Sequence, residues 1–338
     1  MYEVARIAVI CLSVTVYWGQ TAAAAEKLRV LMNYTIEGQH APWFVAKAKG
    51  YFRDAGLDVA IERGYGSGDT VKKVLTGAAD IGFADPVPII TAVAEGQPVK
   101  AIMGGYMQEP CALYSVAEGA NIRQPEQMEG KTIGGPAGDI CITLLEPVMK
   151  KAGADFGKVT VQNVDAATRI PLLATGRIDA LGSFYEKDVL VANGLKAAGK
   201  TPVSWHYDKY LNKYSVMVVT SKKLIETQPD MLQRFVKALL RGYQDTISDP
   251  KAAAEVILSE HPEFDRDYIV SSANSLLQVM WDETSRKMGI GVLDPAKMRD
   301  TIEITRTYWK LPRVPLPEEV FTNTFINAAH EDLKRTAP

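Results

Sequence analysis

The sequence predicts an α/β protein with two lobes, a cleft between them and a helical C-terminal region. From Leu28 the chain alternates short apolar runs with amphipathic stretches, a pattern typical of β-α-β units around a mostly parallel sheet. Its 338 residues are enough for two domains. A local pattern also recurs, because LTGAADIGFAD at 75–85 is echoed by ATGRIDALGSF at 174–184. Two lobes of similar construction would produce this echo.

The first half of the chain contains the opening strands and helices. Pro42 suits a first helical turn, and Gly56 and Gly77 are placed to end helices. The predicted elements, in order, are a strand at 28–33, a helix at 43–52 ending near Gly56, a strand at 57–62, a helix stopping at Gly77 and a strand at 81–84.

The second half repeats this arrangement and then becomes helical. Strands are predicted at 131–135 and 201–205, and a helix at 142–151. From Ser221 onward the pattern is helical. Prolines mark the boundaries in this region. Helix starts are expected near Pro229, Pro250 and Pro295, and an extended segment is expected at Pro312, Pro315 and Pro317.

The first 25 residues have the pattern of a cleavable secretory signal. Arg6 precedes an apolar run at 7–17, and small residues follow at 22–25. The run is about half the roughly 20 residues that a membrane-spanning helix needs. We therefore expect residues 1–25 to be removed and the mature protein to be soluble and periplasmic. A leader or anchor that is retained is the alternative.

The charge balance excludes partners that need a strongly charged surface. Lys and Arg number 38 against 40 Asp and Glu, for a formal net charge of −2. Neither nucleic acid nor an anionic membrane is attracted by such a balance. The 14 Tyr and 5 Trp leave enough rings for a planar-ligand site as well as a core.

No catalytic, metal or cofactor motif is supported. The histidines have neither a neighbouring histidine at helical spacing nor a cysteine companion, which argues against zinc. Residues 194–201 satisfy the phosphate-loop pattern G-x-x-x-x-G-K-T, but Gly199 is placed to end a helix and a strand follows. A phosphate loop has the opposite order, strand then helix. The histidines are His40, His206, His261 and His330.

Removal of the signal would leave two cysteines, Cys111 and Cys141. An oxidising compartment permits a bridge between them. Each lies in an apolar stretch, where buried free thiols are common. We expect packing thiols, with a disulfide as the open alternative.

Four separated segments resemble one known family. They are HAPWFVAKAKGYFRDAGLDV at 40–59, TGAADIGFADP at 76–86, QPEQMEGKTIGGPAGD at 124–139 and TGRIDALGSFYEKD at 175–188. In this order they resemble periplasmic solute-binding proteins of ABC importers, in the branch of thiamine-pyrimidine-precursor binders and their relatives for sulfonates, nitrate and aromatic compounds. The resemblance covers roughly residues 28–190.

The resemblance implies a periplasmic binding protein-like fold of type II, with interrupted lobes. Residues 26–113 and 216–338 would form the first lobe and 114–215 the second, with chain crossings near Tyr114 and Ser215. The yeast-type pyrimidine synthase of the same superfamily carries a cysteine-rich motif that this chain lacks, which disfavours synthase chemistry.

Candidate ligand-binding residues follow from where such receptors bind, at the carboxyl ends of strands and at helix N-termini facing the cleft. Tyr34, Trp43 and Tyr185 can stack on a flat ring. Asp85 and Glu186 can accept hydrogen bonds from amino or cationic groups. The full set is Asn33, Tyr34, His40, Trp43 and Asp85 from the first lobe, and Gly138, Asp139, Tyr185 and Glu186 from the second.

Structural roles compete with these assignments. Trp43 can fill the core of its lobe, Asp139 can cap a helix, and His40 can bond a loop carbonyl. Asp85 and Glu186 follow buried strands at comparable places in the two lobes, which favours ligand contact for both.

The expected function is that of a monomeric, non-enzymatic receptor. Its lobes would close around a small polar or heteroaromatic solute, such as an aminopyrimidine, and present it to an inner-membrane ABC permease. The alternatives are a receptor for a sulfonate, nitrate or aromatic carboxylate, a sensor subunit, and a periplasmic enzyme with His40 as base and Glu186 as acid.

Overall fold

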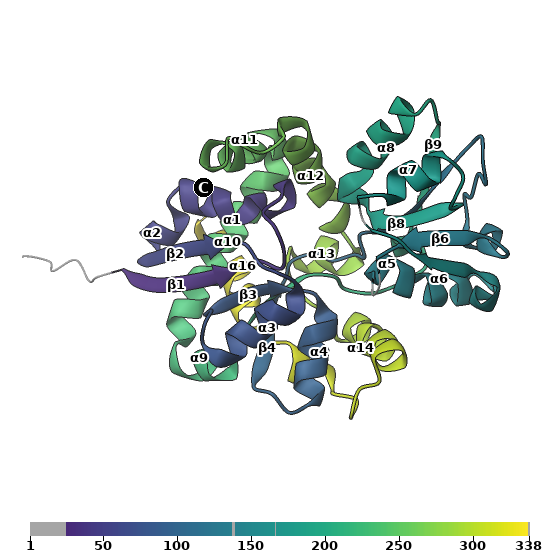
Figure 1. The fold of residues 1–338 in the computed structure, drawn as a ribbon. Coiled ribbons are helices and arrows are strands. Elements are labelled where there is room, and N and C mark those ends of the chain that lie inside the picture. Colours follow the sequence, from purple (N-terminus) through teal and green to yellow (C-terminus); the bar gives the residue numbers. More distant parts are fainter. Residues whose placement is uncertain (1–24, 137–138, 166, 337–338) are drawn as a thin grey trace, which may run out of the picture.

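Two five-stranded sheets of the same design form the two lobes. The computed structural model describes residues 25–136, 139–165 and 167–336. The first sheet has the order β2-β1-β3-β10-β4 and the second β7-β6-β8-β5-β9. In each sheet the first three strands are parallel, and the fourth runs antiparallel to both of its neighbours. Figure 1 shows the second lobe in teal beside the first.

Five strands lie close to the ranges predicted for them, which are 28–33, 57–62, 81–84, 131–135 and 201–205. The strands of the first sheet are β1 (Glu26–Leu31), β2 (Leu57–Glu62), β3 (Ile81–Ala84), β4 (Val99–Gly104) and β10 (Met217–Ser221). Those of the second are β5 (Cys111–Val116), β6 (Thr132–Gly135), β7 (Thr160–Asn163), β8 (Ala180–Phe184) and β9 (Pro202–His206).

Helices cover the sheets, and α11 and α12 lie over the top of the first lobe in Figure 1. Those joined to the first sheet are α1 (Ala41–Ala48), α2 (Tyr51–Asp54), α3 (Ser67–Thr76) and α4 (Pro86–Ala94). Those of the second lobe are α5 (Ile140–Thr143), α6 (Leu145–Lys151), α7 (Arg169–Ala174) and α8 (Asp188–Ala197). Those of the tail are α9 (Lys222–Thr227), α10 (Pro229–Ser248), α11 (Pro250–Glu260), α12 (Arg266–Val279), α13 (Glu283–Met288), α14 (Pro295–Trp309), α15 (Pro317–Val320) and α16 (Thr324–Thr336). The short 3-10 turns are η1 (Gly38–His40), η2 (Pro125–Met128), η3 (Phe156–Lys158), η4 (Tyr185–Lys187) and η5 (Tyr207–Lys209).

Two predicted helices are each divided. The helix expected at 43–52 becomes α1 and α2, because Gly50 adopts φ 76°, a left-handed conformation that ends a helix. The helix expected at 142–151 becomes α5 and α6, with Pro147 in the first turn of α6, where its missing amide proton is tolerated. The segment expected to stay extended to Pro317 ends before it, since Pro317 opens α15.

The chain crosses between the lobes twice. The first crossing connects Gly104 of β4 to Cys111 of β5, and the second connects His206 of β9 to Met217 of β10. Tyr114, near which the first crossing was expected, lies inside β5 and therefore within the second sheet. Ser215 lies within the second crossing.

Cys111 and Cys141 form a disulfide that joins β5 to α5. The expectation of two separate packing thiols was wrong. Both cysteines are buried in the apolar cluster of the second lobe, as their surroundings in the sequence indicate. Their proximity depends on how α5 packs on β5, which local sequence does not reveal.

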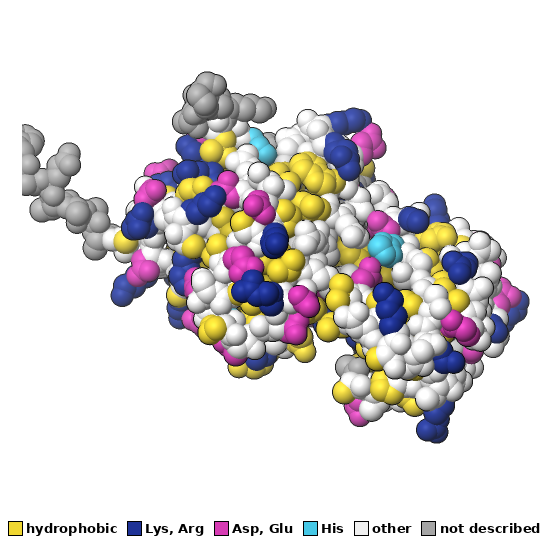
Figure 2. Space-filling view, turned by 90° about the horizontal axis from the view of Figure 1, so that it is seen from above, with side chains coloured by type: hydrophobic (Ala, Val, Ile, Leu, Met, Phe, Trp, Pro, Cys, Tyr) yellow, Lys and Arg dark blue, Asp and Glu magenta, His cyan; other side chains and the backbone are white. Residues whose placement is uncertain are grey.

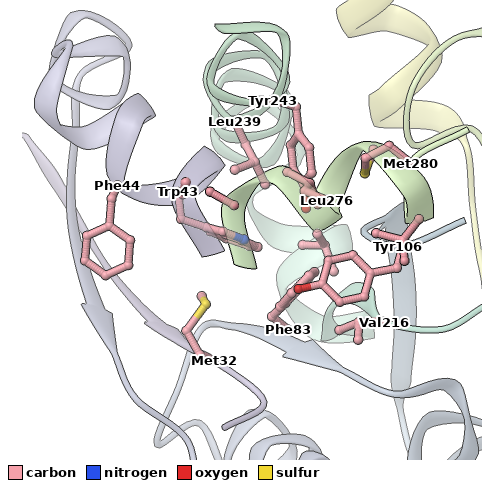
Figure 3. Close-up of a cluster of buried hydrophobic side chains, with 14 of the residues drawn as sticks. Met32, Trp43, Phe44, Phe83, Tyr106, Val216, Leu239, Tyr243, Leu276 and Met280 are labelled. Carbon is pink, nitrogen blue, oxygen red and sulfur yellow. The ribbon is translucent and has the colours of Figure 1, made fainter. Parts of the chain in front are cut away.

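The core of the first lobe is rich in aromatic rings. Figure 3 shows Trp43, Phe83, Tyr106 and Tyr243 gathered between α1, α10 and the first sheet. The ring centroids of Trp43 and Phe83 lie 5.3 Å apart in an edge-to-face arrangement. No helix in the described part of the chain is both long enough and apolar enough to traverse a bilayer. The predicted signal falls, except for residue 25, outside the described residues.

Candidate functional site

A cavity of about 840 Å³ lies between the lobes, with walls from both of them and from the crossings. Figure 2 shows the lobes meeting at a narrower waist, with charges of both signs interspersed on the visible face. Polar and charged lining residues are Asn33, Gln39, Ser67, Lys72, Asp85, Thr91, Glu95, Glu186 and Ser215. Aromatic lining residues are Tyr34, Tyr106, Phe184 and Trp309.

Several of these side chains follow the carboxyl ends of strands, which is where α/β sheets generally bind their ligands. Asn33 and Tyr34 follow β1, Asp85 follows β3, and Glu186 follows β8. The Asp85 carboxylate caps α4 by accepting a hydrogen bond from the Val87 amide at 2.9 Å. Its own amide donates to Ser67 Oγ at 2.9 Å. Asp85 is thus held at the cavity by Oδ1, which caps the helix, while Oδ2 takes no part in capping.

Glu186 is a buried acid at the contact between the lobes, with 3% of its surface exposed. Burial and then the negative charge of Glu37 raise its pKa from 4.5 to about 8, against the opposing effects of Lys187 and Gln39. Glu37 belongs to the first lobe, where its Oε2 accepts a hydrogen bond from Gln39 Nε2 at 3.1 Å. At neutral pH Glu186 therefore carries a proton and can donate a hydrogen bond as well as accept one.

His40 supports the cavity wall from behind. Its Nδ1 accepts a hydrogen bond from the Glu37 amide at 3.0 Å, so Nε2 carries the proton and donates to Asn33 Oδ1 at 3.0 Å. Burial lowers the His40 pKa to about 3, and the ring stays neutral. His40 is fully buried and is absent from the described lining, whereas Asn33 is part of it. Its partners are an amide and a side chain rather than the loop carbonyl considered above.

Three other predicted residues are not among the described residues that line the cavity. Trp43 is buried in the core of the first lobe. Tyr185 stacks on His206 with ring centroids 4.7 Å apart. Asp139 caps α5 by accepting from the Cys141 amide at 2.8 Å and lies 3.6 Å from Arg169. These are the core and capping roles that competed with ligand contact for Trp43 and Asp139. Gly138 lies outside the described residues.

Of the nine predicted residues, Asn33, Tyr34, Asp85 and Glu186 line the cavity. Residues that sequence reasoning missed come from places without a local signal. Tyr106 and Ser215 lie in the crossings, and Trp309 ends α14, far along the tail. Phe184, the last residue of β8, lines the cavity, whereas the predicted Tyr185 opens η4 and stacks on His206 instead.

The lining combines aromatic rings with hydrogen-bonding groups. Tyr106 contributes a buried hydroxyl that has no hydrogen-bond partner among the described residues. Figure 3 shows its ring beside Phe83 and Val216. Within the described part of the chain, no group of three or more His, Cys, Asp or Glu is arranged to hold a metal ion.

The chain is similar to one family of proteins along most of its length. A sequence profile of the family described as NMT1/THI5 like matches residues 37–253, more than half of the chain. Riboflavin-binding protein RibY of Chloroflexus aurantiacus is 25% identical over 309 residues, covering 89% of this chain and 86% of that protein. Formylaminopyrimidine-binding protein of Halalkalibacterium halodurans is 22% identical and covers 89% of this chain and 91% of that protein.

Other relatives carry an enzyme's name. The 4-amino-5-hydroxymethyl-2-methylpyrimidine phosphate synthase THI13 of Saccharomyces cerevisiae is 25% identical over 72% of this chain and 74% of that protein. Among solved structures, the periplasmic aliphatic sulphonate binding protein SsuA of Escherichia coli matches with a TM-score of 0.69 at 12% identity, over 89% of this chain and 99% of that one. This likeness confirms the predicted fold, two α/β lobes of the periplasmic binding protein type.

Proposed function

Because the chain belongs to the NMT1/THI5-like family, we propose that it is the solute-binding component of an ABC importer. It captures a small heteroaromatic solute, an aminopyrimidine, between its lobes in the periplasm and delivers it as a monomer to an inner-membrane permease. The observation that carries this proposal is a cavity whose polar groups come from both lobes, with Asp85 on one side and Glu186 on the other. A ligand that bridges the lobes stabilises their closed arrangement.

The hydrogen-bonding groups of the cavity match an aminopyrimidine. An exocyclic amino group can donate to the Asp85 carboxylate, and a ring nitrogen can accept from protonated Glu186. Tyr34 and Phe184 are available to contact the ring faces. Two relatives named for pyrimidine or flavin ligands support a heteroaromatic solute.

A sulfonate, nitrate or aromatic carboxylate is the alternative ligand class. The SsuA likeness is one of fold and leaves the ligand open. A carboxylate at Asp85 disfavours an anion placed against it. The aminopyrimidine is therefore preferred.

The runner-up function is a periplasmic enzyme using the same cavity, as the synthase-named relatives suggest. The proposed base, His40, is sealed behind the lining with both ring nitrogens engaged, which supports a receptor instead. Recovery of the bound pyrimidine chemically unaltered after prolonged incubation would support the receptor. Chemical conversion of the pyrimidine would instead support the enzyme and contradict the receptor.

The first test is a thermal-shift screen of protein lacking residues 1–25, refolded to remove carried-over ligand. The panel contains aminopyrimidines, thiamine, flavins, purines, polyamines, alkylsulfonates, nitrate and aromatic carboxylates. Ligand at a hundred times its Kd adds about 2.7 kcal/mol of stability and raises Tm by about 2 °C or more. A selective aminopyrimidine response is expected, whereas a selective sulfonate or carboxylate response would keep the receptor and reject the ligand.

Site variants then test the two acids by calorimetry. Asp85→Asn is expected to weaken aminopyrimidine binding on the order of tenfold, through the loss of a charge-assisted hydrogen bond. Glu186→Leu is expected to weaken it to a similar degree, because leucine cannot donate a hydrogen bond to the ring nitrogen. Asp139→Asn is the matched control, since Asp139 caps α5 and is not among the described lining residues. Unchanged affinity in either site variant would remove that residue from the site.

A further inference from the structure

A buried ion pair joins the two chain crossings beneath the cavity. Glu109 lies in the first crossing and Lys213 in the second. Lys213 Nζ donates to Glu109 Oε2 at 2.5 Å, and the two side chains are 0% and 1% exposed. Glu109 Oε1 also accepts from the Cys111 amide at 3.3 Å, and Lys213 Nζ donates to the Tyr214 carbonyl at 3.0 Å. The pair is therefore fixed in place by backbone on both crossings.

Asp85 connects this pair to the cavity. Its Oδ2 lies 3.9 Å from Lys213 Nζ, and its side chain lines the cavity. Pro110 and Ser215, each close in sequence to a member of the pair, line the cavity as well. The ammonium group therefore sits one side chain behind the surface that a ligand would touch.

With both acids ionised, two carboxylates and one ammonium leave this cluster with a net charge of −1. Burial raises the pKa of Glu109, and the Lys213 ammonium 2.5 Å away opposes this effect and favours the ionised pair. Burial lowers the pKa of Lys213, but the charges of Glu109 and Asp85 outweigh it, so the pKa is raised and the amine stays charged. Charges this deep in the protein are weakly screened by salt. At the outer part of the lining, Lys72 and Glu95 carry opposite charges and add nothing net.

We propose that the Glu109–Lys213 pair is a specificity determinant, which sets the charge of the ligand that the cavity accepts. With Lys213 balanced by Glu109, Asp85 keeps its negative charge available for an amino or cationic group and repels anions. Without Glu109, the same ammonium would neutralise Asp85 instead. This inference rests on the proposed function, because it defines the ligand class of the same cavity.

The test uses three aminopyrimidines that share a ring and differ in charge at position 5. They are the 5-aminomethyl (cationic), 5-hydroxymethyl (neutral) and 5-carboxylate (anionic) derivatives of 4-amino-2-methylpyrimidine. Binding to wild type, Glu109→Gln and Lys213→Met is measured by calorimetry at constant ionic strength. Glu109→Gln is expected to raise carboxylate affinity and lower aminomethyl affinity, each on the order of tenfold.

Lys213→Met is expected to change both affinities in the opposite direction, because Asp85 loses its neighbouring cation. The neutral derivative is expected to change less than either charged one. Mirror-image responses of this kind distinguish a charge-setting role from a structural one, since a loosened fold lowers all three affinities together.

Two further variants control for loss of folding and for the general effect of breaking a buried ion pair. Removing one member of a buried pair can prevent folding, whereas replacing both with apolar residues is usually tolerated. The double variant Glu109→Leu/Lys213→Met is thus expected to fold and, because it loses one negative and one positive charge and keeps a net charge of −1, to retain the charge preference of the wild type. Lys297→Met is the matched control: Lys297 forms another buried pair with Asp282 at 2.9 Å, away from the described lining. It should lower stability without a mirror-image response.

A second series separates failure of the proposed ligand from failure of the charge-setting role. Benzamidine (cationic), benzamide (neutral) and benzoate (anionic) are tested at millimolar concentration against the same proteins in a thermal-shift assay. If wild type binds none of the pyrimidines, the aminopyrimidine assignment fails and this second series decides the role of the pair. Equal changes for all charges in a series, or no charge-dependent response in either series, would overturn the proposal.

Discussion

Single buried residues shape this cavity without touching a ligand. His40 is held neutral by burial and holds the Asn33 side chain through Nε2. Lys213 acts similarly on Asp85 from behind the lining. In both cases the residue that lines the cavity depends on a second residue, which a search for exposed polar side chains would overlook.

His40→Leu tests this dependence. The change leaves the Glu37 amide and Asn33 Oδ1 without their present partner, which should cost about 1–3 kcal/mol of unfolding free energy. Affinity for the ligand should also fall, because Asn33 is no longer held. Urea denaturation and calorimetry measure the two effects, and Trp43→Phe, a core change, should lower stability while leaving affinity alone. Equal affinity losses in both variants would contradict the role given to Asn33.

Glu186 makes stability depend on pH. The folded state holds this proton more tightly than the unfolded chain does, with a pKa of about 8 against 4.5. The resulting stabilisation is complete below about pH 4.5 and is lost as pH rises through about 8. His40 acts at acidic pH in the opposite sense, since its folded pKa of about 3 lies below 6.5.

The measurement is urea denaturation of wild type and Glu186→Gln between pH 4.5 and 9. The wild type should lose stability relative to Glu186→Gln across this window and reach a constant difference above pH 8. Subtraction removes the His40 contribution, which both proteins share. Parallel profiles would show that Glu186 titrates normally in the folded protein.

At the scale of elements, close helix contact holds the loop that carries Asn33 and His40. Gly242 of α10 faces α1, where a Cβ atom would come within 2.1 Å of the Pro42 carbonyl oxygen. The α1 helix can rest this closely on α10 only because the position has no side chain. The loop leading into α1 is positioned by this contact.

Gly242→Ala should therefore destabilise the protein by about 3 kcal/mol through overpacking, although alanine favours helix. Gly68→Ala in the first turn of α3 is the control, since nothing lies within 4 Å of an added Cβ there and φ is not positive. Denaturant midpoints compare the two. A Gly242 variant as stable as the Gly68 variant would show that α1 and α10 separate easily.

At the scale of the whole molecule, the disulfide places one covalent link within the second lobe and leaves the first without one among the described residues. A Cys111→Ser/Cys141→Ser variant should lose about 3–4 kcal/mol, as expected for a closed loop of roughly 30 residues. Calorimetric unfolding with and without ligand measures the loss, and reduction of the wild type should reproduce it. An unchanged Tm would mean that the cysteines are not paired in solution.

Much of the architecture could be predicted because its signals are local. Short apolar runs located β1, β2, β3, β6 and β9, and Pro229, Pro250 and Pro295 each open a helix as predicted. Asp85 and Glu186 could be chosen because they follow buried strands. Disulfide pairing and lining residues such as Tyr106 could not be predicted, since they depend on how distant segments pack.

The two crossings also determine the order in which the lobes can be completed during synthesis. The second lobe is one continuous segment, from β5 to β9, and all of its strands are present once residue 206 has emerged. The first sheet lacks β10, which lies between β3 and β4 and comes from residues 217–221. A chain synthesised from its N-terminus thus has every strand of its second lobe before the first sheet is complete, and the edge of β3 stays unpaired until β10 is made.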